Sequence, residues 1–198
     1  MNKNTKALKE IHDELLAATD APLYAYRTEN NYFPVIGEGN HAAEVMFIGE
    51  APGKNEAEQG KPFCGRSGKI LDELLASIEL PRESVYITNI VKDRPPENRD
   101  PTQEEISWYA PYLDRQIDII QPKVIATLGR FSMSYLFDRY GVPQKHKGIS
   151  ELHGTAFEAA TDNHMMHIVA LYHPAAAIYN QALKQTLIDD MRVLASYI

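Results

Sequence analysis

Short apolar runs and longer segments of helical periodicity alternate along this chain. Leucine and isoleucine at helical spacing predict helices over residues 4–18, 69–80, 102–120, 130–137 and 177–197. Runs rich in β-branched and aromatic residues predict four buried strands, EVMFIGE, SVYITNI, KVIATLG and HIVALYHP. Thr102, with Glu105 three residues later, forms a capping-box pattern at the start of the third helix. Asparagine and proline predict loops over residues 19–40 and 92–101.

Strands that alternate with helix-sized connections predict an α/β fold. We expect a central, mostly parallel four-stranded sheet between two layers of helices, in a single domain over residues 1–198. In such folds ligands bind beyond the carboxyl ends of the strands. Those ends carry Gly49-Glu50, Thr88-Asn89, Leu128-Gly129 and Tyr172-His173-Pro174. Polar groups from several strands are therefore expected to face one small ligand.

Composition narrows the class of protein. No apolar run approaches the roughly 20 residues that span a bilayer, and the polar start lacks a secretion-signal pattern. We therefore expect a cytoplasmic protein that does not contact a membrane. The single cysteine, Cys64, excludes an internal disulfide and any metal site built from several thiolates. The formal net charge of −7 excludes a uniformly basic surface but is compatible with a local positive stripe.

Residues 49–68, GEAPGKNEAEQGKPFCGRSG, connect the first predicted strand to the second predicted helix. Neither the phosphate-loop pattern nor the dinucleotide-binding glycine pattern follows the strand at the required spacing. The glycines therefore favour a tight turn or a close approach of the backbone to phosphate groups. Arg66 and Lys69 either add positive charge to that contact or are surrounded by water alone. Phe63 either anchors the loop to the core or offers its ring to a flat base.

Asn89 and His173 are the candidate reactive groups at the strand ends. Asparagine there commonly forms a turn, but its carboxamide both donates and accepts, as the O4 and N3–H of uracil require. Cytosine presents the opposite polarity, so the same amide would discriminate against it. His173 either bonds a backbone carbonyl in a structural role or donates to an oxygen on which negative charge develops. The residues alone leave these alternatives open.

Four blocks of sequence carry a resemblance to a known family: GEAPGKNEAEQGKPFCGRSG, VYITNIVKDRPPENRDPT, PKVIATLGR and YHPAA. In this order and spacing they resemble the family 4 uracil-DNA glycosylases, the thermostable iron–sulfur type, from about residue 37 to the last helix. The resemblance implies an enzyme that flips uracil out of DNA and hydrolyses its N-glycosidic bond, which leaves an abasic site in base excision repair. Two alternatives remain: a uracil-DNA-binding protein with weak or no turnover, and a glycosylase for other deaminated bases.

The resemblance also implies roles for individual residues. Glu50 and His173 would be catalytic, with Glu50 orienting water or stabilising the sugar cation and His173 bonding uracil O2. The uracil-binding residues would be Gly49, Ala51, Phe63 and Asn89. The DNA-contacting residues would be Gly65, Arg66, Ser67, Gly68, Ala175 and Ala176. Further positive charge along the DNA is expected from Lys54, Lys61, Lys69, Arg94, Arg99 and Lys184.

The sequence departs from this family at its metal cluster. The family holds a [4Fe–4S] cluster with four cysteines, and the corresponding positions here are Ala18, Ala21, Asp93 and a site near Tyr109. Cys64 cannot replace four thiolates, so we expect no cluster, no other metal and no cofactor. The expected substitute is packing in this region by Tyr24, Tyr26, Trp108 and Tyr109. Asp93 is expected to bond backbone or a nearby arginine.

The loop over residues 92–101 bears on turnover. Some relatives of the family bind uracil-DNA covalently through a histidine in an inserted basic loop after the second strand. The loop here is short and has no histidine, so release of the product is expected. The expected partner is uracil-containing DNA, and the expected oligomeric state is a monomer.

Overall fold

The computed structural model describes residues 2–161 and 164–198, and its centre is one sheet. Within these residues the sheet has six strands in the order β1-β3-β2-β4-β6-β5. The four inner strands run parallel and match the four predicted ones: β3 (Tyr86–Asn89), β2 (Val45–Gly49), β4 (Val124–Leu128) and β6 (Met165–Leu171). The predicted mostly parallel sheet is therefore confirmed.

Two antiparallel edge strands bring the sheet from the predicted four strands to six. They are β1 (Glu38–Gly39), which pairs with β3, and β5 (Thr155–Ala160), which pairs with β6. The first has only two residues, both exposed, and the second reads TAFEAA with only Ala159 buried. Neither carries the apolar run from which a buried strand is predicted, because an edge strand is covered on fewer sides.

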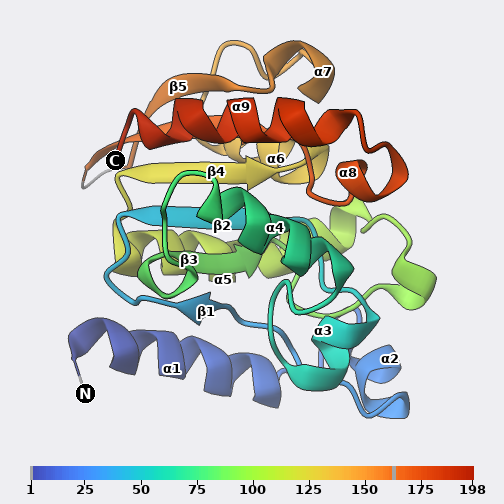
Figure 1. The fold of residues 1–198 in the computed structure, drawn as a ribbon. Coiled ribbons are helices and arrows are strands. Elements are labelled where there is room, and N and C mark those ends of the chain that lie inside the picture. The colour runs from blue at the N-terminus through green and yellow to red at the C-terminus, as the bar shows by residue number, and fades with distance from the viewer. Residues whose placement is uncertain (1, 162–163) are drawn as a thin grey trace.

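Helices cover both faces of the sheet, which confirms the three predicted layers (Figure 1). One layer holds α1 (Lys3–Ala17), α5 (Gln103–Ile120) and α6 (Arg130–Arg139). The other holds α4 (Arg66–Ala76) and α9 (Leu183–Ala195), which lie in front in this view. Successive side chains of a strand point to opposite faces, so Met46 packs with the first layer and Phe47 with the second.

Four of the five predicted helices begin and end within four residues of α1, α4, α5 and α6. The side chains of Thr102 and Glu105 form the predicted capping box at the start of α5. The prediction of one helix over residues 177–197 is wrong, because Asn180 adopts an extended conformation and divides it into α8 (Ala176–Tyr179) and α9. Short elements not predicted are α2 (Tyr24–Glu29), α3 (Lys54–Gln59), α7 (Ile149–Leu152), η1 (Arg82–Ser84) and η2 (Pro96–Asn98).

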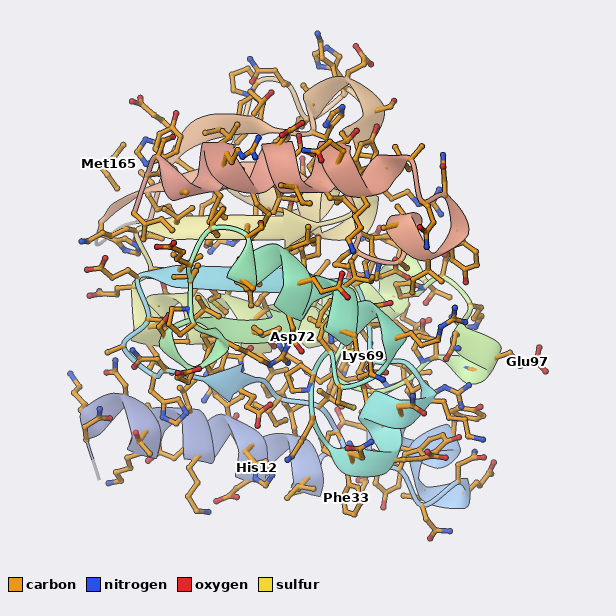
Figure 2. The ribbon with its side chains drawn as sticks, in the orientation of Figure 1. His12, Phe33, Lys69, Asp72, Glu97 and Met165 are labelled. Atoms are coloured by element: carbon orange, nitrogen blue, oxygen red, sulfur yellow. The ribbon has the colours of Figure 1, made fainter. Side chains whose placement is uncertain are left out.

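The carboxyl ends of the four parallel strands meet at one edge of the sheet. The register pairs Gly49 with Asn89 and Leu128 with Leu171, so the segments that follow these residues emerge side by side. α8 and the loop over residues 92–101 lie at the same edge, on the right in Figure 1. Glu97, in that loop, projects away from the body of the molecule (Figure 2). No helix in the described part of the chain is long and apolar enough to cross a membrane.

Candidate active site

A cavity of about 470 Å³ opens at this edge of the sheet. Seven of the predicted site residues line it: Glu50, Ala51, Phe63, Ser67, Asn89, His173 and Ala175. Five lining residues were not predicted for the site: Gly53, Glu56, Asn98, Asp100 and Tyr179. The strand ends and residues 49–68 therefore converge on a single hollow, as the topology required.

Gly49 allows the carboxamide of Asn89 and the ring of Phe63 to lie close together. A Cβ atom at Gly49 would overlap Asn89 Oδ1 and would lie 2.8 Å from Phe63 Cζ. Asn89 and Phe63 are both buried, with exposed fractions of 2% and 6%. Only a residue without a side chain fits between these two groups, so the role of Gly49 in the pocket follows from its missing Cβ.

The loop that carries Phe63 depends on a second glycine. Phe63 adopts a positive φ of 48°, which is uncommon for a residue with a side chain. A Cβ atom at Gly68 would overlap the Phe63 carbonyl, so the first turn of α4 packs directly beneath this loop. Gly68 is itself buried, and this placement gives it a part in shaping the aromatic wall of the cavity.

Glu56 bonds the start of α4 from within the cavity wall. Its Oε1 accepts hydrogen bonds from the backbone N–H groups of Cys64 and Gly65, at 3.1 and 2.8 Å. These are N–H groups at a helix start, which would otherwise be available to an anion. The backbone donor of Gly65, a predicted DNA contact, is therefore engaged within the protein. Arg66 remains exposed and Ser67 partly exposed at the same helix start.

His173 is held as a neutral hydrogen-bond donor. Its Nδ1 accepts from the backbone N–H of Ala175 at 3.1 Å, which places the ring proton on Nε2. Burial lowers the pKa of His173 to about 4, so the ring is uncharged near neutral pH. The ring lies 5.7 Å from that of Phe63, centroid to centroid, with a tilt of 33°. His173 and Phe63 thus line adjacent parts of the same cavity.

The side chain of Glu50 stays protonated up to a pH near neutrality, because its pKa is raised. Burial, and then the negative charge of Asp100, raise the pKa of Glu50 to about 7, while Arg130 opposes the shift. Arg130 bonds Asp100 at 2.6 Å, so its charge is shared between the two acids. A half-buried carboxyl with this pKa in the same cavity as an amide and a neutral imidazole is a combination found at catalytic sites.

In the described part of the chain, some of the predicted DNA-contacting basic residues form ion pairs or hydrogen bonds within the protein, and others do not. Lys54, Arg99 and Lys184 form ion pairs with Glu58, Glu105 and Glu73. Arg94 bonds Asn98 at 2.7 Å and the hydroxyl of Tyr32 at 2.8 Å. Within residues 2–161 and 164–198, no ion pair engages Lys61, Arg66 or Lys69, and all three side chains are exposed. Among these predicted basic residues, the positive charge without an acidic partner therefore lies around the start of α4 and on Arg94.

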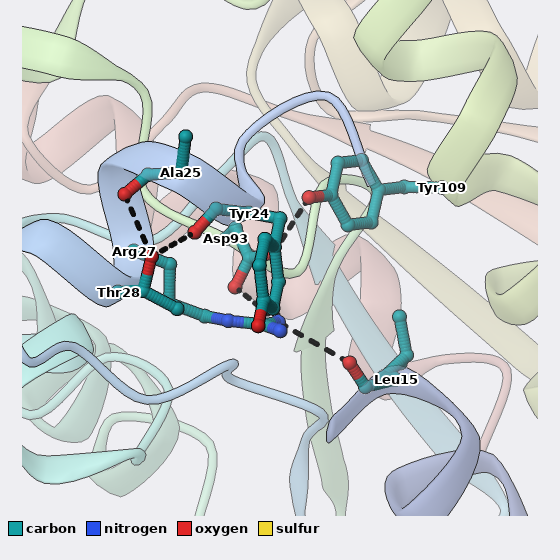
Figure 3. A network of polar contacts seen from close by, with 7 residues as sticks. All are labelled: Leu15, Tyr24, Ala25, Arg27, Thr28, Asp93 and Tyr109. Atoms are coloured by element: carbon teal, nitrogen blue, oxygen red, sulfur yellow. Dashed lines mark hydrogen bonds and ion pairs between the residues drawn. The ribbon is translucent and has the colours of Figure 1, made fainter. Parts of the chain in front are cut away.

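A buried polar network includes Asp93 and Tyr109, at and near two of the positions that the family resemblance assigns to cluster cysteines (Figure 3). Asp93 accepts from Arg27 Nη1 at 3.0 Å and from the Tyr109 hydroxyl at 2.6 Å, and its side chain is fully buried. Arg27 also donates to the Leu15 carbonyl at 3.2 Å and lies 5.2 Å from the centre of the Tyr24 ring. Asp93 thus bonds a nearby arginine, the second of the two predicted alternatives.

This network ties four segments together and does not fit an iron–sulfur cluster. It joins the end of α1, α2, the start of the loop over residues 92–101, and α5. Ala18 and Ala21 carry no ligand atom, Asp93 and Tyr109 bond each other, and Cys64 lies in the loop between α3 and α4. Among the described residues, no group of three or more His, Cys, Asp or Glu is arranged to hold a metal ion.

The fold and the cavity define an α/β protein with a hollow, lined by polar and aromatic side chains, at the carboxyl ends of its parallel strands. The sequence model that describes the uracil DNA glycosylase superfamily matches residues 36–192 of this chain. The chain is 43% identical to the type-4 uracil-DNA glycosylase of Sulfurisphaera tokodaii, over 94% of this chain and 82% of that protein. It is 41% identical to the type-4 uracil-DNA glycosylase of Archaeoglobus fulgidus, over 94% of this chain and 91% of that protein. The chain therefore belongs to the uracil-DNA glycosylase superfamily, as its motifs predicted.

Proposed function

We propose that this protein removes uracil from DNA by hydrolysing the N-glycosidic bond, which leaves an abasic site. Membership of the superfamily and the names of the type-4 relatives support this activity. The observation that carries it is the joint presence of Asn89, Phe63 and His173 in the lining of one cavity. An amide, an aromatic ring and a neutral imidazole donor together suit a planar base that departs as an anion.

The base enters the cavity only after leaving the DNA stack, since its glycosidic bond is unreachable inside a duplex. Phe63 then lies against the plane of uracil, while the Asn89 carboxamide donates to O4 and accepts from N3–H. As the bond between C1′ and N1 breaks, Nε2–H of His173 donates to O2, where negative charge develops. Glu50, as a carboxylate, orients the attacking water or stabilises the sugar cation.

The DNA strand lies across the start of α4 and the segment that follows His173. Arg66 and Ser67, with Lys61 and Lys69, supply the phosphate contacts on one side of the cavity. On the other side of the cavity, Ala175 and Ala176 begin the segment that lies against the DNA at the position from which the flipped uracil has left. The oligomeric state that we propose is a monomer.

We also propose that the protein works without an iron–sulfur cluster. One cysteine in 198 residues cannot supply the thiolates, and the pair of Asp93 and Arg27 connects the segments that the family's cluster braces. No step of the reaction is assigned to a metal. The chemistry rests on the strand ends, which lie in the same protein but outside this network.

The proposed activity is tested by single-turnover cleavage of an oligonucleotide with one deoxyuridine, followed by alkaline scission at the abasic site. We expect cleavage of the uracil strand and none of matched strands that carry thymine or cytosine. Tight binding of the uracil strand without abasic product would contradict the proposal and favour a binding protein. Faster cleavage at hypoxanthine or xanthine would move the activity to another deaminated base.

Replacing Asn89 with aspartate should lower the rate of uracil excision by about 10- to 100-fold, because a paired amide is worth about 1–3 kcal/mol. An ionised carboxylate accepts but does not donate, so it repels uracil O4. The measurement is the single-turnover rate on uracil, with Asn30→Asp as the matched exposed control. An unchanged rate in Asn89→Asp would remove this residue from base recognition.

The rate of excision should rise with pH through about 7, because the pKa of Glu50 is raised to about 7 and its carboxylate is the active form. His173 loses its charge at about pH 4, so it adds no second limb near neutrality. Single-turnover rates between about pH 5 and 9 should show this rise in the wild type and lose it in Glu50→Gln. A rise of the same midpoint in the variant would assign the titration to another group.

A further inference from the structure

A buried lysine lies directly behind the strand end that carries Asn89. Lys92 follows Asn89 by three residues, and its side chain has no exposed surface. Its Nζ donates to the backbone carbonyl of Asn89 at 2.6 Å, to Thr88 Oγ1 at 2.8 Å and to Gln116 Oε1 at 2.6 Å. Lys92 does not line the active-site cavity, and no step of the proposed reaction involves its side chain.

The surrounding hydrogen bonds define the protonation state of Lys92. The carbonyl of Ile36 can only accept, and it receives bonds from Thr88 Oγ1 at 2.6 Å and Gln116 Nε2 at 2.9 Å. Gln116 must therefore turn its Oε1, and Thr88 a lone pair, toward the lysine. Three acceptors thus surround Nζ. A neutral amine has two protons to donate, whereas an ammonium has three and satisfies all of them.

This ammonium has no carboxylate beside it. In the part of the chain that the structure describes, none of the ion pairs involves Lys92, and its three partners are neutral. Burial alone lowers the pKa of Lys92 well below its ordinary value, so retention of the charge depends on these three acceptors. A buried charge held only by neutral dipoles acts on its surroundings with little screening.

We propose that Lys92 is a positioning residue that fixes the Asn89 strand end and places a positive charge, held by its three acceptors, behind the uracil pocket. The charge stabilises the base as it departs, and this role rests on the proposed removal of uracil. In that step the C1′–N1 bond breaks and its electron pair stays on the base, spread over N1, O2 and O4. Lys92 keeps its proton throughout, and the water that adds to C1′ releases its own proton to solvent.

The test compares two leaving groups. Uracil and 5-fluorouracil are placed in the same single-stranded oligonucleotide, and single-turnover rates are measured for the wild type and Lys92→Met. Fluorine stabilises the anion on the base itself, so the enzyme's charge matters less. We expect Lys92→Met to lose about 10-fold on uracil, less than a direct oxyanion donor is worth, and about threefold or less on 5-fluorouracil.

Lys123→Met is the matched control, because it removes an exposed lysine paired with Glu44 at the opposite end of the strands. It should leave both rates unchanged. Equal losses on the two bases in Lys92→Met would indicate a purely structural role and overturn the proposal. Unchanged rates on both bases would overturn it as well. Failure of the wild type to cleave either strand would instead contradict the proposed function.

A second variant decides the matter where Lys92→Met does not fold. Gln116→Glu keeps an acceptor at Nζ but adds a carboxylate that cancels the charge of the ammonium. It should show the same pattern, with a larger loss on uracil than on 5-fluorouracil. A folded Gln116→Glu protein with equal losses on both bases, or with none, would overturn the proposal.

Discussion

Replacing His173 with alanine is expected to lower the single-turnover rate of uracil excision by about 10²- to 10³-fold, the usual loss for one oxyanion donor. The Nε2–H group is aimed by the bond that Nδ1 accepts from Ala175, and burial keeps the ring neutral at working pH. A neutral donor strengthens its bond to O2 as charge develops there, so the ground state gains less from it than the transition state.

The measurement is a rapid-quench time course under single-turnover conditions, together with the affinity for a uracil strand. Affinity should change much less than the rate, because the lost bond is made mainly in the transition state. His173→Gln, which keeps an N–H donor, should recover part of the rate. Wild-type activity in His173→Ala would remove this residue from the mechanism.

The position of the site could be predicted from the sequence because it depends on strand ends. Each apolar run has a definite last residue, and parallel pairing brings those ends to one edge. The pairing of Gly49 with Asn89 therefore brings Asn89 and Glu50, the residue after Gly49, to the cavity. Four short runs with clear boundaries carried this prediction, and the structure places Glu50, Asn89 and His173 together as expected.

The cavity residues that were missed lie on elements with no apolar period. α3 has six residues and buries only Ala57, so its sequence gives no helical signal and Glu56 was not assigned to the site. Tyr179 was placed within one long helix, whereas the break at Asn180 ends α8 beside the cavity with Tyr179 exposed. Such details depend on tertiary contacts that no local pattern records.

Lys92 and Asp93 show a different limit of sequence-based prediction. A run of three charged residues before a pair of prolines is typical of a solvated loop, yet the side chains of the first two, Lys92 and Asp93, are buried. Each side chain has a partner far along the chain, since Gln116 follows Lys92 by 24 residues and Arg27 precedes Asp93 by 66. Only the fold brings these groups together, so the sequence could suggest an arginine for Asp93 but could not identify Arg27.

Replacing Asp93 with alanine is expected to lower the free energy of unfolding by about 3–5 kcal/mol, because it leaves Arg27 buried and unpaired. In a chain of this size each kcal/mol corresponds to about 2–4 °C, so the melting temperature should fall by roughly 6–20 °C. Thermal and denaturant unfolding measure the effect. Glu44→Ala, which breaks the exposed pair with Lys123, is the control and should change little.

A second substitution, at Arg27, separates the effect of the unpaired charge on stability from the effect of lost packing. Arg27→Met with Asp93→Ala removes both charges, so the double variant should be more stable than Asp93→Ala alone, since no unpaired charge stays buried. Tyr109 then loses its acceptor, which keeps the double variant below the wild type. Excision by the folded fraction should persist in both, because the strand ends remain in place. A melting temperature unchanged by Asp93→Ala would mean that packing alone joins these segments and that the ion pair is dispensable.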